Sequence, residues 1–157
     1  MMEKKTNYEK MAKELEKVLH HKNYLMGNLA NASAVINNNM EDVNWVGFYL
    51  LHKDELFLGP FQGKDIAKTR VPLFKGLIGK AMRDYETKVD NDSAMCPCAE
   101  QCEDLVKSEI AIPIFYNREP VGVLNIDSTS KDRFSAEDVK ALEEMATLVQ
   151  KVWRHMY

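Results

Sequence analysis

The sequence predicts an α+β fold in which a mostly antiparallel sheet of about five or six strands is covered on one face by helices from both ends of the chain. Apolar residues recur at helical spacing near both termini. The segments between them are short, rich in β-branched and aromatic residues, and joined mainly by turns. No repeat or linker divides the 157 residues, so we expect a single domain over residues 1–157. The other face of the sheet would support loops and a pocket.

The N-terminal half should begin with two helices and continue into the sheet. A stripe of apolar side chains among Lys and Glu predicts the first helix, and Asn37-Asn38-Asn39 should end the second. The segment N-W-V-G-F-Y-L-L is apolar on both alternating faces, which predicts a central strand covered on both sides. The glycines and proline of G-P-F-Q-G-K should prevent strand pairing there. The expected elements are helices at 7–21 and 25–36, strands at 44–51 and 55–58, and a loop at 59–64.

The C-terminal half should contain a short helix, a strand hairpin and a final helix. Gly76-x-x-Gly79 is interpreted as a tight turn before the short helix, because it lacks the Lys-Ser/Thr ending of a phosphate-binding loop. Ser135 can cap the final helix, with Asp138 completing a capping box. The expected elements are a weak strand at 66–71, a helix at 80–84, a loop at 89–107, strands at 108–115 and 119–127, and a helix after 135. Loops as long as the one at 89–107 are usually functional.

Charge and composition exclude several classes of protein. The formal net charge of −3 argues against general affinity for nucleic acid or an anionic membrane. No apolar run approaches the roughly 18 residues that span a bilayer, and the charged N-terminal segment lacks the apolar core of a secretion signal. We therefore expect a cytoplasmic protein that binds neither nucleic acid nor membrane. In that reducing compartment, clustered cysteines more often serve catalysis, redox sensing or metal binding than structural stabilisation.

All three cysteines lie within M-C-P-C-A-E-Q-C, at Cys96, Cys98 and Cys102. A thiolate is a strong nucleophile, and a second thiol nearby can resolve its oxidation product. A flexible loop could join Cys102 to either of the others, whereas Cys96 and Cys98 would make a strained pair. Three thiolates with a histidine could bind zinc, but no histidine lies near in the sequence. Redox chemistry without metal or cofactor is favoured, with zinc binding and inert loop thiols as alternatives.

Acidic and amide side chains interrupt the apolar hairpin. Asn125 and Asp127 are two residues apart and share one face of their strand, and Glu109 begins the neighbouring strand. All three could face one cavity, where burial of a carboxylate requires a partner. The alternative is that Glu109 is an exposed strand start and Asp127 begins a capped turn. Trp45, on the central strand, is more often a core residue than a platform for a ligand.

Five segments of the sequence form a recognisable set. They are N-W-V-G-F-Y-L at 44–50, L-G-P-F-Q-G-K at 58–64, S-E-I-A-I-P-I at 108–114, G-V-L-N-I-D-S at 122–128 and R-F-S-A-E-D at 133–138. Together they resemble the single-domain GAF proteins called free methionine-(R)-sulfoxide reductases. The resemblance runs from about Tyr8 to the last helix and implies a GAF-like fold.

The resemblance implies a reaction and its participants. A cysteine at the position of Cys102 attacks free methionine-(R)-sulfoxide and becomes a sulfenic acid, and a second cysteine then forms a disulfide that thioredoxin reduces. Glu109 and Asp127 match acids that bind and polarise the sulfoxide oxygen, and Trp45 matches a tryptophan that walls the substrate methyl group. Asn125 belongs to the same substrate-binding set. The resemblance also implies a homodimer.

The sequence departs from the family pattern at several positions. Lys68 and Ile78 stand where the family usually carries the partner cysteines, and Asn125 replaces an Asp, which weakens the ammonium-binding end of the pocket. The first interpretation is that Cys98, or Cys96, has taken over resolution within the cysteine loop. The second is a non-catalytic GAF module that binds or senses a small molecule, and a zinc-binding variant is less favoured.

Overall fold

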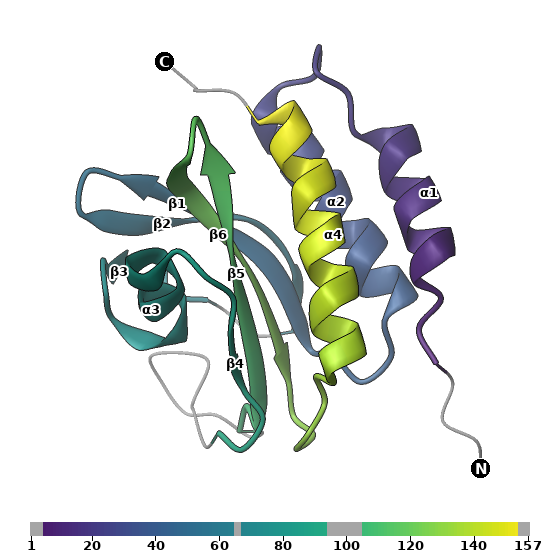
Figure 1. Cartoon of the computed structure of the whole chain (residues 1–157), viewed down its shortest axis with the longest axis vertical. Helices are drawn as coiled ribbons and strands as arrows, with labels where there is room; N and C mark the ends of the chain where they lie inside the picture. The colour runs from purple at the N-terminus through teal and green to yellow at the C-terminus, as the bar shows by residue number, and fades with distance from the viewer. Residues whose placement is uncertain (1–4, 65–66, 94–104, 154–157) are drawn as a thin grey trace.

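The computed structural model describes residues 5–64, 67–93 and 105–153, and these form a six-stranded antiparallel sheet with helices on both sides (Figure 1). The strand order across the sheet is β3-β2-β1-β6-β5-β4. The strands are β1 (Trp45–His52), β2 (Glu55–Gly63), β3 (Arg70–Pro72), β4 (Lys88–Asp90), β5 (Ser108–Tyr116) and β6 (Glu119–Ser128). The sheet therefore places the hairpin β5–β6 beside the central strand β1, as an antiparallel α+β fold requires.

Two helices, α2 (Leu25–Asn39) and α4 (Ala136–Val152), cover one face of the sheet, and α1 (Tyr8–Val18) packs against these two on the side away from the strands (Figure 1). The helix α3 (Gly76–Asp84) lies on the opposite face. This confirms the prediction that helices from both ends of the chain share one face. The first helix is shorter than expected from 7–21, because its backbone becomes extended at Leu19. Among the helices in the described ranges, none has the length and apolarity to cross a membrane.

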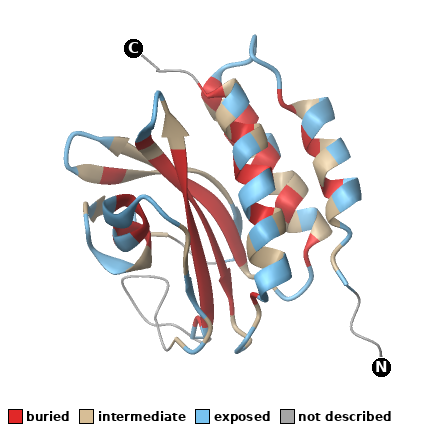
Figure 2. Cartoon of the chain, in the orientation of Figure 1, coloured by how far each residue is buried: buried red, intermediate tan, exposed pale blue. Residues whose placement is uncertain are grey.

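The central strands are buried on both faces (Figure 2). Val46 and Phe48 of β1 belong to the larger core, which lies under α1, α2 and α4. Trp45 and Tyr49 alternate with them and belong to a smaller core that includes Ile78 of α3. The prediction of a central strand covered on both sides is confirmed, and the two cores separate a structural face from a face that carries a cavity.

The predicted loop at 59–64 is wrong, because β2 continues through this segment to Gly63. The register of β1 and β2 shifts between Gly47, opposite Phe61, and Tyr49, opposite Leu58. The proline that argued against a strand thus lies at a β-bulge, where its missing N–H breaks no regular ladder bond. The bulge lets the strand continue, and residues beyond it reach the edge of the cavity face.

Two further boundaries differ from expectation. The segment 89–107, predicted as one loop, begins with residues of the short strand β4, which pairs with β5. The weak strand predicted at 66–71 is described only as β3, at residues 70–72. Strands of three residues are too short to show a hydrophobic period, so pattern alone could not place them.

Helix α3 begins at Gly76, four residues earlier than the predicted 80–84. Gly76 has a φ of +65°, a left-handed conformation that favours glycine. A Cβ at Gly79 would lie 2.4 Å from the carbonyl carbon of Phe74, so the first turn of the helix packs directly on the preceding backbone. The prediction of a tight turn at residues 76–79 is therefore wrong, because these residues form the first turn of α3, and the chain turns just before it, at Leu73 and Phe74.

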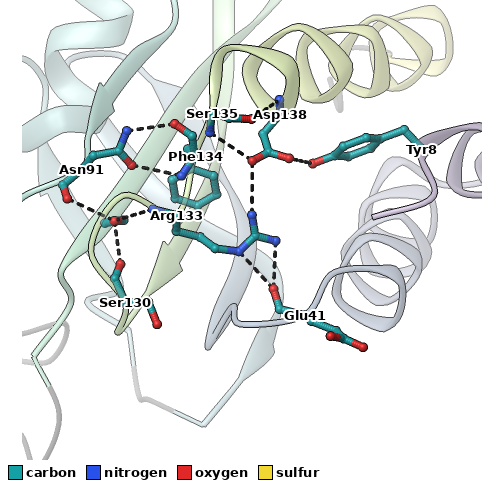
Figure 3. A network of polar contacts seen from close by, with 9 residues as sticks. Tyr8, Glu41, Asn91, Ser130, Arg133, Phe134, Ser135 and Asp138 are labelled. Carbon is teal, nitrogen blue, oxygen red and sulfur yellow. Dashed lines mark hydrogen bonds and ion pairs between the residues drawn. The ribbon is translucent and has the colours of Figure 1, made fainter. Parts of the chain in front are cut away.

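The start of α4 is joined to α1 and to the segment that follows α2 by a polar network (Figure 3). Ser135 and Asp138 form the predicted capping box, with Ser135 Oγ accepting from the Asp138 N–H at 3.1 Å. Tyr8 donates to Asp138 Oδ1 at 2.7 Å, and Arg133 forms an ion pair with Asp138 Oδ2 at 3.3 Å. Arg133 also donates to the backbone oxygen of Glu41. These contacts join the start of α4 to α1 and to the backbone that follows α2.

Candidate active site

The sheet register aligns one aromatic and three acidic residues in one row across the strands. Trp45 of β1 lies opposite Asp127 of β6, and Asp127 lies opposite Glu109 of β5. Asp90 of β4 continues the row opposite Glu109. Directly paired residues of an antiparallel sheet have Cβ atoms roughly 4.5–5.5 Å apart. Residues that are far apart in the sequence therefore meet because of strand pairing alone.

A cavity of about 420 Å³ lies on the face of the sheet that carries α3. Trp45, Glu109, Asn125 and Asp127 all line it from the sheet side. Residues 67–68, 70–72 and 75–78 line it from the segment between β2 and α3 and from the first turn of that helix. The three polar residues predicted to face one cavity do so, and the alternative of an exposed Glu109 is wrong because only 6% of that residue is accessible.

Burial raises the pKa of Glu109 above its usual value. Hydrogen bonding with Asp127 and Asn125 opposes this shift, whereas the charge of Asp90 adds to it. Asn125 is itself fixed, since its Nδ2 donates to the Ile110 carbonyl oxygen at 3.0 Å. Two carboxyl groups buried at one site cannot easily ionise together, so this pair favours holding a proton. A protonated carboxyl in a cavity can donate a hydrogen bond to an oxygen of a ligand.

The Trp45 indole packs closely against two glycines, Gly47 and Gly63. A Cβ at Gly47 would be 2.5 Å from Trp45 Cη2, and a Cβ at Gly63 would be 2.7 Å from Trp45 Cδ1. Phe61 stacks on the indole with ring centroids 5.2 Å apart. The indole Nε1 is buried and has no hydrogen-bond partner among the described residues. Trp45 is thus both a core residue and a wall of the cavity, so the two expectations for it do not exclude each other.

Tyr49 is a cavity residue that sequence reasoning missed. Its hydroxyl donates to the Lys68 carbonyl oxygen at 3.2 Å, which anchors the segment between β2 and β3. Burial raises the pKa of Tyr49 to about 12, with the charges of Asp127 and Glu109 adding to the effect. The hydroxyl is therefore a neutral donor at physiological pH. Its position four residues after Trp45 on one strand places both side chains on one face, and that alternation was the available signal.

Cys96, Cys98 and Cys102 lie outside the described residues. The residues that flank their segment are joined by a hydrogen bond from the Ser93 N–H to the Lys107 carbonyl oxygen at 2.8 Å. Ser93, which follows β4, and Lys107, which immediately precedes β5, therefore lie side by side. Among the described residues, no group of three or more His, Asp and Glu side chains could hold a metal ion.

Two of the predicted departures face the same cavity. Lys68 and Ile78, which stand at the positions where the resemblance leads us to expect cysteines, both line it. Ile78 is buried, whereas Lys68 is exposed at the cavity. At these two positions the cavity wall therefore carries a cation and an apolar group.

Residues 34–153 match the GAF domain family. The chain is 34% identical over 151 residues to the free methionine-R-sulfoxide reductase of Escherichia coli, covering 96% of this chain and 91% of that one. It therefore belongs to the GAF domain family, within the group of relatives that includes free methionine-R-sulfoxide reductases.

Solved structures give the same relationship. The structure of fRMsr of Staphylococcus aureus in complex with substrate superposes with a TM-score of 0.87 at 36% identity, over 97% of this chain and 99% of that chain. The free methionine-R-sulfoxide reductase of Neisseria meningitidis, in complex with its substrate, superposes with a TM-score of 0.82 at 35% identity, over 92% and 87% of the two chains. The predicted family and GAF fold are confirmed.

Proposed function

We propose that this protein is an L-methionine (R)-S-oxide reductase, which converts free L-methionine-(R)-sulfoxide to methionine. The observation that carries the proposal is the buried pair of Glu109 and Asp127, which lines a cavity together with Trp45. A sulfoxide has a strongly accepting oxygen and an apolar methyl group, and this cavity offers a carboxyl donor beside an aromatic wall. Relatives that carry this enzyme name match the chain over nearly its whole length, which supports the proposal.

In the proposed mechanism the acidic pair activates the sulfoxide. The methyl group of the substrate packs on the Trp45 indole, and Glu109 or Asp127, whichever holds the shared proton, donates it to the sulfoxide oxygen. The positive character of the sulfur then increases, so a thiolate can attack it. Cys102 attacks, the sulfur–oxygen bond breaks, and oxygen passes to the cysteine as a sulfenic acid while methionine leaves.

A second thiol completes the turnover. Cys98, or otherwise Cys96, attacks the sulfenic sulfur of Cys102, releasing water and forming a disulfide. Both lie within six residues of Cys102, so a short loop keeps the attacking thiol at high effective concentration. Thioredoxin then reduces the disulfide by thiol exchange and returns both cysteines to the thiol form. Resolution within one loop would compensate for the residues at positions 68 and 78, which cannot form a disulfide.

The decisive experiment follows NADPH oxidation through thioredoxin reductase and thioredoxin with free L-methionine-(R)-sulfoxide as substrate. We expect turnover with the (R) epimer, little with the (S) epimer, and none in the Cys102→Ser variant. Cys98→Ala should accumulate oxidised protein without turnover, with Cys96→Ala as its matched control. If only Cys96→Ala loses turnover, the resolving cysteine is Cys96.

Two other outcomes would replace the proposal. Saturable binding of the sulfoxide without NADPH oxidation would favour a binding or sensing module. This is the second candidate because positions 68 and 78 carry no cysteine. Stoichiometric zinc in the purified protein would favour the metal alternative for the cysteines. We also propose a homodimer, and sedimentation of the purified protein at the mass of a single chain would contradict that part.

A further inference from the structure

The cavity has an acidic and a basic side. Glu109 and Asp127 line it from β5 and β6, whereas Lys68, Arg70 and Lys75 line it from the segment between β2 and α3. An anion that enters beside the acidic pair is repelled unless a cation lies near. A ligand that carries a negative charge at one end would therefore orient with that end toward the basic side.

The three basic residues differ in what already neutralises them. Arg70 forms a two-pronged ion pair with Glu55 and lies over the Phe57 ring at 5.4 Å from its centroid. Neither the Lys68 ammonium nor the Lys75 ammonium has an ion pair or a hydrogen bond with any described residue. Two cations at the cavity wall are thus available to a ligand.

The backbone of Lys68 is fixed at the cavity. The buried Tyr49 hydroxyl donates to the Lys68 carbonyl oxygen, so the residue is held against the sheet although its side chain is exposed. Lys75 immediately precedes α3. The backbone of Phe74, next to it, packs closely on Gly79 in the first turn of that helix. Both lysines therefore project from ordered backbone on one wall.

We propose that Lys68 and Lys75 bind the α-carboxylate of a free amino acid whose sulfoxide end lies against Glu109 and Asp127. The inference rests on the proposed function and adds the residues that select the free form of the substrate. A methionine sulfoxide within a peptide has no α-carboxylate, and its amide carbonyl offers the lysines no charge. The two cations thereby distinguish a free amino acid from a protein side chain.

The test compares L-methionine sulfoxide with its carboxamide, in which the carboxylate charge is removed and the rest is kept. The wild type, Lys68→Met, Lys75→Met and the double variant are assayed for kcat/KM with both compounds. Lys80→Met, an exposed lysine of α3 that does not line the cavity, is the matched control. Binding of L-methionine and L-methioninamide by calorimetry provides a readout that does not need turnover.

Each exposed charge pair should contribute a factor of roughly two to five, so the wild type should prefer the acid over the amide by about tenfold. Each single variant should lose part of that preference, and the double variant nearly all, through a higher KM with the acid only. If the double variant turns over and its ratio of kcat/KM for the acid to kcat/KM for the amide equals that of the wild type, the inference is overturned and the proposed function stays intact. Lysine-dependent binding of L-methionine without turnover would instead refute the function alone, and a wild type with no preference for the acid would refute the inference.

Discussion

Glu109 and Asp127 lie directly opposite each other on β5 and β6, and 6% and 5% of their surfaces remain accessible. The pairing is a consequence of strand register, because the two residues are direct partners in the β5–β6 hairpin. Burial would strongly disfavour two negative charges there, and the contact with Asn125 supplies a neutral partner. The raised pKa of Glu109 therefore favours a protonated carboxyl at this position of the hairpin.

Asp90→Asn should shift the alkaline limit of activity to lower pH. Asp90 lies opposite Glu109 on β4, and its charge contributes to the raised pKa of Glu109. Removing that charge lowers the pKa, so the protonated donor is lost at a lower pH than in the wild type. The pH profile of kcat/KM measures the shift. Asp92→Asn, which removes a nearby exposed charge paired with Lys131, is the control and should leave the limit unchanged.

Glu109→Gln should change the pH dependence of stability as well as activity. The folded-state pKa of Glu109 is raised, so between the unfolded value and the raised value the folded protein binds more protons than the unfolded chain. The free energy of unfolding therefore falls as pH rises through that window. Glutamine does not titrate, so the variant lacks this loss of stability. The free energy of unfolding of the variant minus that of the wild type, measured with urea, should therefore be more positive at pH 8 than at pH 4. An identical difference at both values would contradict the raised pKa, and the variant should lose reductase activity at either pH.

Much of this site could be predicted from the alternation of residues along strands. The spacing of Asn125 and Asp127 on one strand, and the position of Glu109 at the start of its neighbour, allowed all three to face one cavity, but the pairing of β5 with β6 was needed to decide against an exposed Glu109 and a capped turn. The Ser135 capping box was equally local, because both partners lie within one turn of helix. Local patterns succeed where the interacting atoms are near in sequence or related by the two-residue period of a strand.

The rest of the cavity depended on contacts that no local pattern records. The β2 strand passes through Pro60 because a bulge absorbs the proline, and that depends on the register with β1. The contribution of Tyr49 depends on a hydrogen bond to Lys68, 19 residues away. The short β4 strand is defined only by its pairing with β5. Tertiary pairing, rather than intrinsic preference, decides such segments.

Gly47→Ala should disturb the substrate wall without affecting the helical layer. A Cβ at this position would lie 2.5 Å from both Trp45 Cη2 and Phe61 Cβ, so the indole must be displaced from its position over Gly47. We expect at least a tenfold loss of kcat/KM and a loss of roughly 1–3 kcal/mol in stability from overpacking. Near-ultraviolet circular dichroism should report the displaced tryptophan.

The matched control for that variant is Gly27→Ala. Gly27 lies on the exposed side of α2, and a Cβ there meets no atom within 4 Å. Alanine is the better helix former, so this variant should gain up to about 1 kcal/mol of stability with unchanged activity. If both glycine variants behave alike, the close approach of the Trp45 indole to Gly47 is not what limits the site.

Tyr8→Phe should destabilise the fold in a pH-dependent manner while the cavity keeps its shape. Burial opposes ionisation of Asp138, but hydrogen bonds from Tyr8 and Ser135 lower its pKa below the usual value. The ionised carboxylate therefore stabilises the fold above its unfolded pKa, and this contribution is lost as pH falls through the lowered folded value. Loss of a hydrogen bond to a charged group should cost about 1.5–3 kcal/mol at pH 7, measured by urea unfolding, and distinctly less at pH 3. Tyr24→Phe, at a tyrosine that is 92% exposed, should change stability at neither pH. An equal cost for Tyr8→Phe at both pH values would show that the hydroxyl stabilises the fold independently of the charge of Asp138, which would contradict the prediction.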